Sequence, residues 1–282
     1  MPQASSTPGH TKSALACQGC GEPYQKDDLT GLTYCTRCEI ILSLMPEGRT
    51  YMLLGESGSG KSILLYKLMD LYIRSSRPCI YRALDEPPTQ LRASVGGLIG
   101  GLEQNERDGL LTFVDCHSCM GGLVSQEKHH MDSPGDLNGL GFLLSKLVAD
   151  LGKERPVRIC IDSVTAMFAH CDSDAIVKFL YSTSARVKSA GGSLFFTING
   201  GAVSPEVQKR LEQLADGLIE FKVTESPGTT KRYFRFSKVR GKLYFDTWTP
   251  FFVGKNAIQL APPEEGETRD RFYKVFELIK AG

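Results

Sequence analysis

A mostly parallel α/β sheet flanked by helices is the fold class that the sequence predicts, with extra antiparallel strands near its end. From about residue 46 to residue 254, short apolar runs alternate with amphipathic stretches, the pattern of strands that alternate with covering helices. The 282 residues are 41% hydrophobic, which is enough to bury a sizeable core. The strand-like segments late in this region are joined by turns and predict the antiparallel part.

Each expected element follows from its local pattern. Apolar runs predict strands at 51–54, 78–84, 110–115, 157–161 and 193–197. Helical spacing of apolar residues predicts helices at 61–75, 90–105, 136–151, 172–189 and 205–214. Further strands are expected at 218–223, 232–238 and 242–245. Residues 116–134 have no clear period, so we expect a long mobile loop there.

The composition divides the chain into four parts. Residues 1–15 are rich in Ser, Thr and Pro without periodicity and predict a disordered lead. Residues 16–42 hold two closely spaced cysteine pairs, and residues 46–254 form the α/β region. Residues 255–282 form a tail in which 269–281 has the spacing of a short helix.

Charge and hydropathy exclude several classes of protein. Thirty-three Lys and Arg against 32 Asp and Glu leave a net charge of +1, so tight nonspecific binding of nucleic acid is possible but not supported by charge. The longest uncharged apolar-leaning run, residues 93–102, is far shorter than the roughly 20 residues of a membrane-spanning helix. The first fifteen residues hold no apolar stretch typical of a secretion signal. A cytoplasmic protein without membrane insertion is therefore expected.

Residues 55–62 read GESGSGKS, a complete match to the phosphate-binding loop G-x-x-x-x-G-K-[ST]. Glycines let backbone N–H groups curl around phosphates, and the following helix start favours negative charge. The alternative is a Gly/Ser-rich turn that matches by accident, but the flanking strand and helix favour the phosphate loop. The residues expected to bind the nucleotide are Gly55, Glu56, Ser57, Gly58, Ser59, Gly60, Lys61 and Ser62.

Carboxylates follow two of the predicted strands. Asp162 ends the apolar run Ile-Cys-Ile and suits a Walker B acid, which would bind Mg²⁺ together with Ser62. The alternative is that Asp162 begins a helix as its N-cap. Asp85 and Glu86 end another strand, where a carboxylate could activate water; the alternative is a solvated acid before a turn.

Lys238 and Arg240 lie two residues apart at the close of a predicted strand. Both side chains would lie on one face of that strand and could contact phosphate charge. The alternative is the charged end of a hairpin, and composition does not separate the two.

Five motifs in order give a family resemblance: GESGSGKS, LDEPPTQL, ICIDSVT, LADGLIEF and SKVRG. Together they resemble the KaiC-type branch of the RecA superfamily of P-loop ATPases, over about residues 46–250. The resemblance implies a ring of identical subunits, usually a hexamer, with ATP held between neighbours. It also implies a protein partner that reads the state of the ring, although the sequence does not name one.

The resemblance assigns roles to individual residues. Lys61 and Ser62 resemble the Walker A pair, and Asp162 resembles the Walker B acid. Of the acidic pair that activates water, we favour Glu86 as the base, because Asp85 is one methylene shorter than the glutamate usual in the family. Lys238 and Arg240 resemble the fingers that contact the γ-phosphate bound to the neighbouring subunit. Asn199 resembles a polar sensor of the γ-phosphate.

The chain departs from the clock-type members of this family. Those that phosphorylate themselves carry adjacent hydroxyl residues before the LADG segment, whereas residues 211–215 here read LEQLA. Self-phosphorylation at that place is therefore not expected. A single ATPase domain is present instead of a tandem pair.

Four of the nine cysteines form a C-x₂-C-x₁₄-C-x₂-C pattern, which predicts a tetrahedral zinc ribbon. A redox pair and an iron–sulfur cluster are the alternatives. The ribbon has two basic residues against four acidic ones, which argues against phosphate contact. A ribbon before such an ATPase also resembles the bacterial RadA/Sms repair proteins. The predicted zinc ligands are Cys17, Cys20, Cys35 and Cys38.

A second C-x-x-C at Cys116 and Cys119, with His129 and His130 beyond it, suggests either another metal site or a polar loop, and we favour the loop. The functional expectation is a ring ATPase that hydrolyses ATP slowly and signals to a partner. The alternatives are a regulatory scaffold that binds ATP without hydrolysis and a DNA-repair ATPase with a DNA-facing loop near 199–210.

Overall fold

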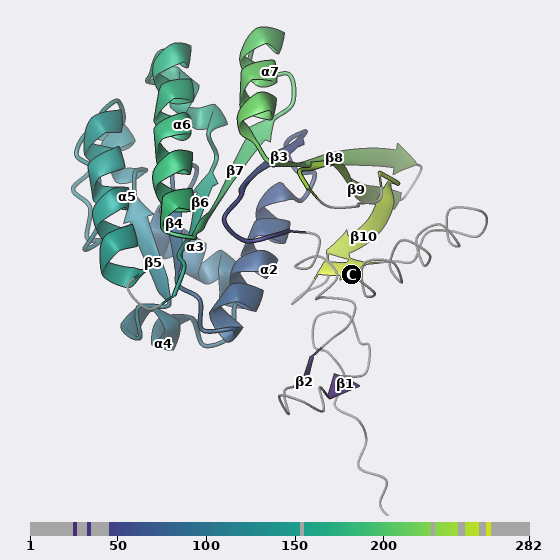
Figure 1. Cartoon of the computed structure of the whole chain (residues 1–282), viewed down its shortest axis with the longest axis horizontal. Helices are drawn as coiled ribbons and strands as arrows, with labels where there is room; N and C mark the ends of the chain where they lie inside the picture. Colours follow the sequence, from purple (N-terminus) through teal and green to yellow (C-terminus); the bar gives the residue numbers. More distant parts are fainter. Residues whose placement is uncertain are drawn as a thin grey trace, which may run out of the picture.

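The computed structural model describes residues 25–26, 33–34, 45–152, 155–226, 229–241, 246–253 and 258–260 (Figure 1). Within this part, one sheet of nine strands organises the molecule, parallel from β5 to β8 and antiparallel from β8 to β11. In spatial order its strands are β11 (Ile258–Leu260), β10 (Thr249–Val253), β9 (Thr229–Val239), β8 (Gly217–Ser226), β3 (Thr50–Gly55), β7 (Ser193–Asn199), β6 (Arg158–Asp162), β4 (Cys79–Ala83) and β5 (Leu111–Asp115).

Helices cover both faces of the parallel part (Figure 1). One face packs on α2 and α3, and the other packs on α5, α6 and α7. Strand side chains alternate between the two cores: Phe195 of β7 faces α2, whereas Leu194 and Phe196 face α6 and α7. The described helices are α2 (Lys61–Arg74), α3 (Pro88–Val95), α4 (Leu102–Arg107), α5 (Leu137–Leu151), α6 (Ser173–Ser189) and α7 (Pro205–Leu214), with short 3₁₀ turns η1 (Ser118–Gly121) and η2 (Thr165–Ala169).

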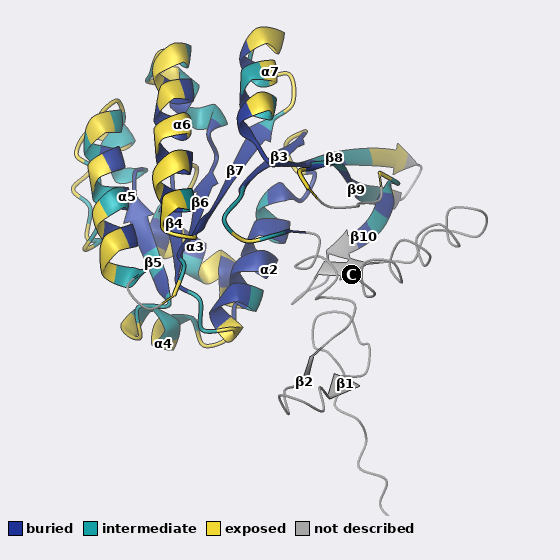
Figure 2. Ribbon diagram, in the orientation of Figure 1, coloured by how far each residue is buried: buried dark blue, intermediate teal, exposed yellow. Residues whose placement is uncertain are grey.

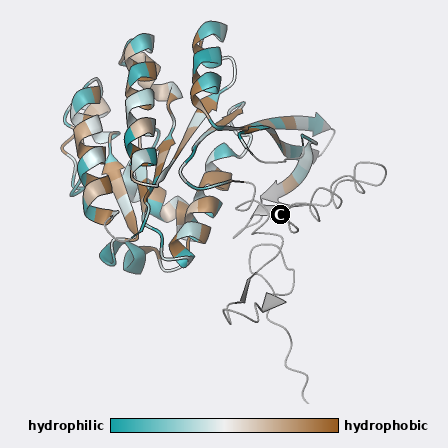
Figure 3. Cartoon of the chain, in the orientation of Figure 1, coloured by the Kyte–Doolittle hydropathy of each residue, from teal (hydrophilic) through white to brown (hydrophobic). Residues whose placement is uncertain are grey.

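Burial and hydropathy follow this layering. The central strands are buried and apolar, while the outer faces of α5, α6 and α7 are exposed (Figures 2 and 3). These outer faces carry many polar residues but also expose Phe142 of α5 and Tyr181 of α6. N-cap side chains start the three outer helices: Asp136 accepts from Gly139 N at 2.8 Å, Asp172 from Asp174 N at 2.8 Å, and Ser204 precedes Pro205 at the first turn of α7. Each cap of this kind typically contributes about 1 kcal/mol.

The expected parallel strands and flanking helices are confirmed, with two corrections. The single helix expected at 90–105 is two helices: α3 ends at Val95, and α4 begins at Leu102 after Gly101, whose φ of 65° is not helical. Residues 116–134 form the expected loop, and buried Asp115 anchors part of it by accepting hydrogen bonds from Ser118 and Ser125 at 2.6 Å. The strand expected at 242–245 lies outside the described residues, and neither β10 nor β11 was expected.

The structure describes only a small part of the predicted amino-terminal zinc ribbon. Strands β1 (Gln25–Lys26) and β2 (Thr33–Tyr34) pair antiparallel, between the two cysteine pairs of the sequence. The four cysteines themselves, the lead at 1–15 and the helix expected at 269–281 lie outside the described residues, so the zinc ribbon stays a prediction. The described residues contain no group of three or more His, Cys, Asp or Glu side chains arranged for a metal ion. No helix in this part of the chain combines the length and apolar character needed to cross a membrane.

Candidate nucleotide-binding site

The phosphate-binding loop connects buried strand β3 to helix α2, as its sequence predicts. Gly58 and Gly60 adopt φ 73° and 99°, a backbone region that side chains other than glycine rarely occupy. A Cβ atom at Gly60 would also lie 2.8 Å from the ring of Phe251 on β10. Strands β9, β10 and β11 form the antiparallel extension of the sheet. Through β10 this antiparallel extension packs directly on the loop, and only glycine fits at position 60.

Lys61 is the first residue of α2, and its side chain folds back over the loop. Its Nζ donates to Gly55 O at 2.8 Å and to Glu56 O at 2.7 Å. The side chain is buried, and desolvation lowers the pKa of Lys61, while the negative charge of Asp162 opposes that shift. The ammonium group is thus held at the loop, close to a carboxylate.

Predicted site residues from four strand ends meet in one cavity of about 220 Å³ at the carboxyl edge of the sheet. Small-molecule pockets usually measure about 300–1,000 Å³, so this cavity has room for phosphates but leaves the rest of a nucleotide at the surface. The lining residues are Ser57, Gly58, Gly60, Lys61, Ser62, Ile63, Asp85, Asp162, Ser163, Thr197 and Asn199.

Asp162 ends β6 and is the most constrained acid of the cavity. It is buried, and its two oxygens accept hydrogen bonds from two hydroxyl groups: Oδ2 from Tyr81 at 2.8 Å and Oδ1 from Thr197 at 2.5 Å. Sequence reasoning missed both partners. Their only signal was a hydroxyl group within an apolar strand.

The acidic pair after β4 divides between the cavity and the solvent. Asp85 lines the cavity and accepts from Ser163 Oγ at 3.4 Å, whereas Glu86 is exposed and is not among the lining residues. Although Asp85 is exposed as a whole, desolvation at the strand end raises the pKa of its carboxyl group. Of this pair, the geometry therefore places Asp85 at the cavity, whereas the family resemblance favours Glu86 as the base.

Asn199 ends β7 and lines the cavity, as expected for a sensor of phosphate. Its backbone N–H donates to Thr165 Oγ1 at 2.9 Å, which fixes the end of the strand.

Arg232 of β9 was not predicted to belong to the site. Its Nε donates to Gly58 O at 3.1 Å, so a guanidinium group lies at the phosphate loop of its own chain. Arg232 of β9 and Phe251 of β10 therefore both contact the phosphate loop from the same end of the sheet.

Lys238 and Arg240 do not line the cavity of their own chain. Lys238 Nζ donates to Glu212 O at 2.9 Å and Ala215 O at 2.6 Å, at the end of α7. Arg240 pairs with Asp216 at 3.0 Å, and desolvation lowers the pKa of Lys238. Both cations therefore meet at the junction of α7 and β8.

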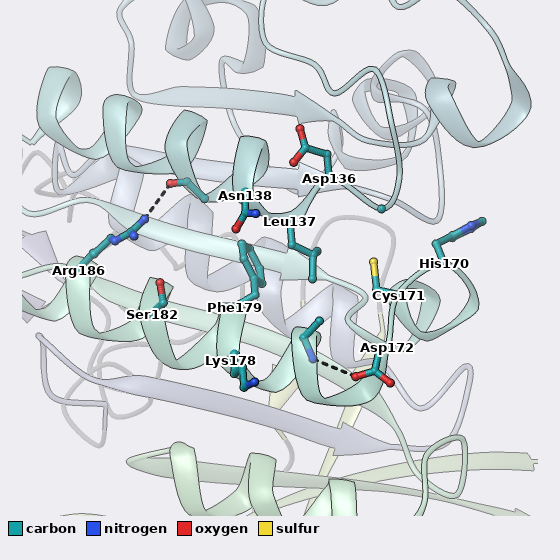
Figure 4. A pocket seen from close by; sticks show the side chains of 13 residues that line it. Asp136, Leu137, Asn138, His170, Cys171, Asp172, Lys178, Phe179, Ser182 and Arg186 are labelled. Atoms are coloured by element: carbon teal, nitrogen blue, oxygen red, sulfur yellow. Dashed lines mark hydrogen bonds between the residues drawn. The ribbon is translucent and has the colours of Figure 1, made fainter.

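A larger hollow of about 580 Å³ lies between α5 and α6 and includes His170 and Cys171 (Figure 4). Apart from buried Phe179 its walls are mostly exposed side chains, such as Lys178 and Arg186. It contains none of the predicted site residues and no glycine-rich phosphate loop, so size alone does not make it the functional site.

Comparisons with known proteins identify the family of the chain. The family model described as "ATPase: KaiC" matches residues 39–265. A UPF0273 protein of Methanopyrus kandleri is 26% identical over 244 residues, which cover 82% of this chain and 93% of the relative. The circadian clock protein KaiC3 of Synechocystis is 24% identical over 224 residues, which cover 77% of this chain and 42% of that protein.

A solved structure shares the fold. The KaiC-like protein PH0186 of Pyrococcus horikoshii superposes with a TM-score of 0.62 at 20% identity, covering 77% of this chain and 91% of that one. With the family match over most of the chain, the conclusion is direct: the chain belongs to the KaiC family of ATPases.

Proposed function

We propose that this protein binds ATP with Mg²⁺ and hydrolyses it slowly, within a ring of identical subunits whose nucleotide state is read by a protein partner. The observation that carries the proposal is the meeting of the phosphate loop, Asp162, Asp85 and Asn199 in one cavity. Fold alone does not establish chemistry, but these groups supply cation, carboxylate and amide functions around a phosphate-sized space.

The donor set fits Mg²⁺, which prefers oxygen ligands. The hydroxyl of Ser62 and the carboxylate of Asp162 both line the cavity and would hold the ion. When bound, Mg²⁺ would offset the negative charge of the β- and γ-phosphates.

The residues of the chain would perform the remaining steps. Lys61, and Arg232 beside the loop, place positive charge where the γ-phosphate develops negative charge. A carboxylate of the pair Asp85–Glu86 would orient a water molecule and take its proton as the water attacks the γ-phosphorus atom and the bond to the β-phosphate oxygen breaks. A raised pKa makes Asp85 a stronger base than an ordinary aspartate once it is ionised.

A neighbouring subunit would complete the site. The cavity covers only the phosphates, so the rest of the nucleotide would lie where a second chain can cover it. By their likeness to the family's fingers, Lys238 and Arg240 of that neighbour would contact the γ-phosphate. This requires them to leave the α7 carbonyls and Asp216 that they contact within their own chain. In a closed ring, a hexamer in this proposal, every subunit would receive the same two cations from its neighbour.

The experiment is ATP binding and steady-state hydrolysis at a protein concentration that allows assembly. Wild type is compared with Glu86→Gln and Asp85→Asn, and with Glu103→Gln as the matched control, because Glu103 is 86% exposed on α4. Loss of a positioned base is expected to lower the rate by about 10²–10⁴-fold without abolishing ATP binding. Which variant loses activity identifies the base.

The outcomes separate the candidate functions. Binding without hydrolysis in the wild type would favour the regulatory scaffold that binds ATP. Absence of binding, in a folded protein with Mg²⁺ present, would refute the proposal altogether.

A further inference from the structure

The carboxylate of Asp162 is held from two sides by neutral hydroxyl groups. Tyr81 lies on β4 and Thr197 on β7, the two strands that flank β6. Each donates to a different oxygen of Asp162, at 2.8 Å and 2.5 Å. Two hydrogen bonds of this kind fix the rotation of the carboxylate about its side-chain bonds, and so fix the directions of its remaining lone pairs.

A second tyrosine supports the first. Tyr66 OH lies 3.2 Å from Tyr81 OH, and the two ring centroids are 5.6 Å apart. Tyr66 belongs to α2, the helix that begins at Lys61, so the hydroxyl chain joins the helix of the phosphate loop to Asp162. Both tyrosines are buried, and neither lines the cavity. They can act on a ligand of the site only through Asp162.

The hydrogen-bond donors to Asp162 are neutral, which affects the charge that Asp162 can offer to a cation. An Arg or Lys partner would cancel the charge of Asp162, whereas phenol and alcohol groups orient it and leave the full negative charge for a cation.

We propose that Tyr81 is a positioning residue that orients Asp162 for Mg²⁺, with Tyr66 holding Tyr81 in place. This inference rests on the proposed function, because it assigns the support of the magnesium site within it. Removal of such an outer hydrogen bond to a metal ligand typically costs about 10–100-fold in metal affinity. Tyr81→Phe is therefore expected to raise the Mg²⁺ concentration needed for half-maximal effect by about tenfold or more.

The test measures ATP affinity by calorimetry across a series of Mg²⁺ concentrations, which needs no turnover. Tyr51→Phe is the matched control: Tyr51 is equally buried and donates its hydroxyl to Pro46 O at 2.7 Å, away from Asp162. We expect Tyr81→Phe to shift the Mg²⁺ dependence and to leave ATP affinity without Mg²⁺ unchanged. Equal behaviour of the two variants would overturn the inference.

A double-mutant cycle with Asp162→Asn separates positioning from a general structural effect. If Tyr81 acts through Asp162, Tyr81→Phe adds no further shift in the Asp162→Asn background. An additional shift of the same size would contradict the assignment.

A further variant covers a failure of Tyr81→Phe to fold. Tyr66→Phe removes only the outer hydroxyl of the chain and is expected to shift the Mg²⁺ dependence in the same direction by a smaller factor; no shift overturns the role of the hydroxyl chain. If the wild type itself binds ATP with no dependence on Mg²⁺, the proposed magnesium-ATP function falls, and this inference with it. A magnesium-dependent wild type beside an unaltered Tyr81→Phe removes this inference alone.

Discussion

The contact between β10 and the phosphate loop predicts an unusual cost for Gly60→Ala. The residue has φ 99°, and left-handed backbone costs about 1–2 kcal/mol for a residue with a Cβ atom. The new Cβ would also lie 2.8 Å and 2.9 Å from two ring atoms of Phe251, and overpacking of this kind costs about 1–3 kcal/mol. The two causes together predict a loss of about 2–5 kcal/mol in the free energy of unfolding.

Urea unfolding, followed by circular dichroism, measures this loss against two comparisons. Gly58→Ala is the matched control, since Gly58 has φ 73° but nothing within 4 Å of its Cβ position, so only the backbone cost of about 1–2 kcal/mol is expected. In a Phe251→Leu background, which removes the two ring atoms, Gly60→Ala should cost no more than Gly58→Ala. An undiminished cost in that background would refute the packing of β10 on the loop.

Three other predictions concern Asp85, the cysteine pairs and the contact between subunits. The raised pKa of Asp85 means that ionisation opposes folding, so stability falls as pH rises from the ordinary carboxyl pKa through the raised one; urea unfolding of Asp85→Asn should show this fall reduced. Elemental analysis of the purified protein should find one zinc per chain, lost in Cys17→Ser but kept in Cys171→Ser, and absence of zinc from the wild type would contradict the ribbon. Mixing inactive Lys61→Met with inactive Lys238→Met should restore activity, because about a quarter of the interfaces in a random ring combine an intact loop with an intact finger; no recovery would argue against fingers that act across subunits.

The phosphate loop could be predicted from sequence because its chemistry is local. Eight consecutive residues hold the glycines, the lysine and the hydroxyl, and the flanking patterns give the strand and the helix. The acids at the ends of β4 and β6 could be placed near it for a similar reason: carboxyl ends of parallel strands share one edge of the sheet. Asp85, Asp162 and Asn199 do line one cavity with the loop, and their roles there stay predictions.

Partners that depend on strand order could not be predicted. Tyr81 lies 81 residues before Asp162 in the chain, and Thr197 lies 35 after it. They meet only because β6 lies between β4 and β7, an arrangement that no local pattern specifies. The contacts of Arg232 and Phe251 with the loop have the same origin, because the antiparallel extension folds back along α2.

The placement of Lys238 depends on a β-bulge between β8 and β9, which the alternation of side chains along a regular strand does not predict. Between Leu218 and Ile219 the pairing advances one residue on β8 but two on β9, from Lys238 to Phe236. Strict alternation along β9 would put Lys238 on the buried face that carries Phe236. Because the bulge inserts one extra residue, Val239 and not Lys238 points into that core. The ammonium of Lys238 consequently reaches the carbonyls that end α7, on the other side of the sheet. A bulge that re-aims one lysine in this way is a local device for presenting a cation, and it locates the candidate finger at the α7–β8 junction, away from the cavity of its own chain.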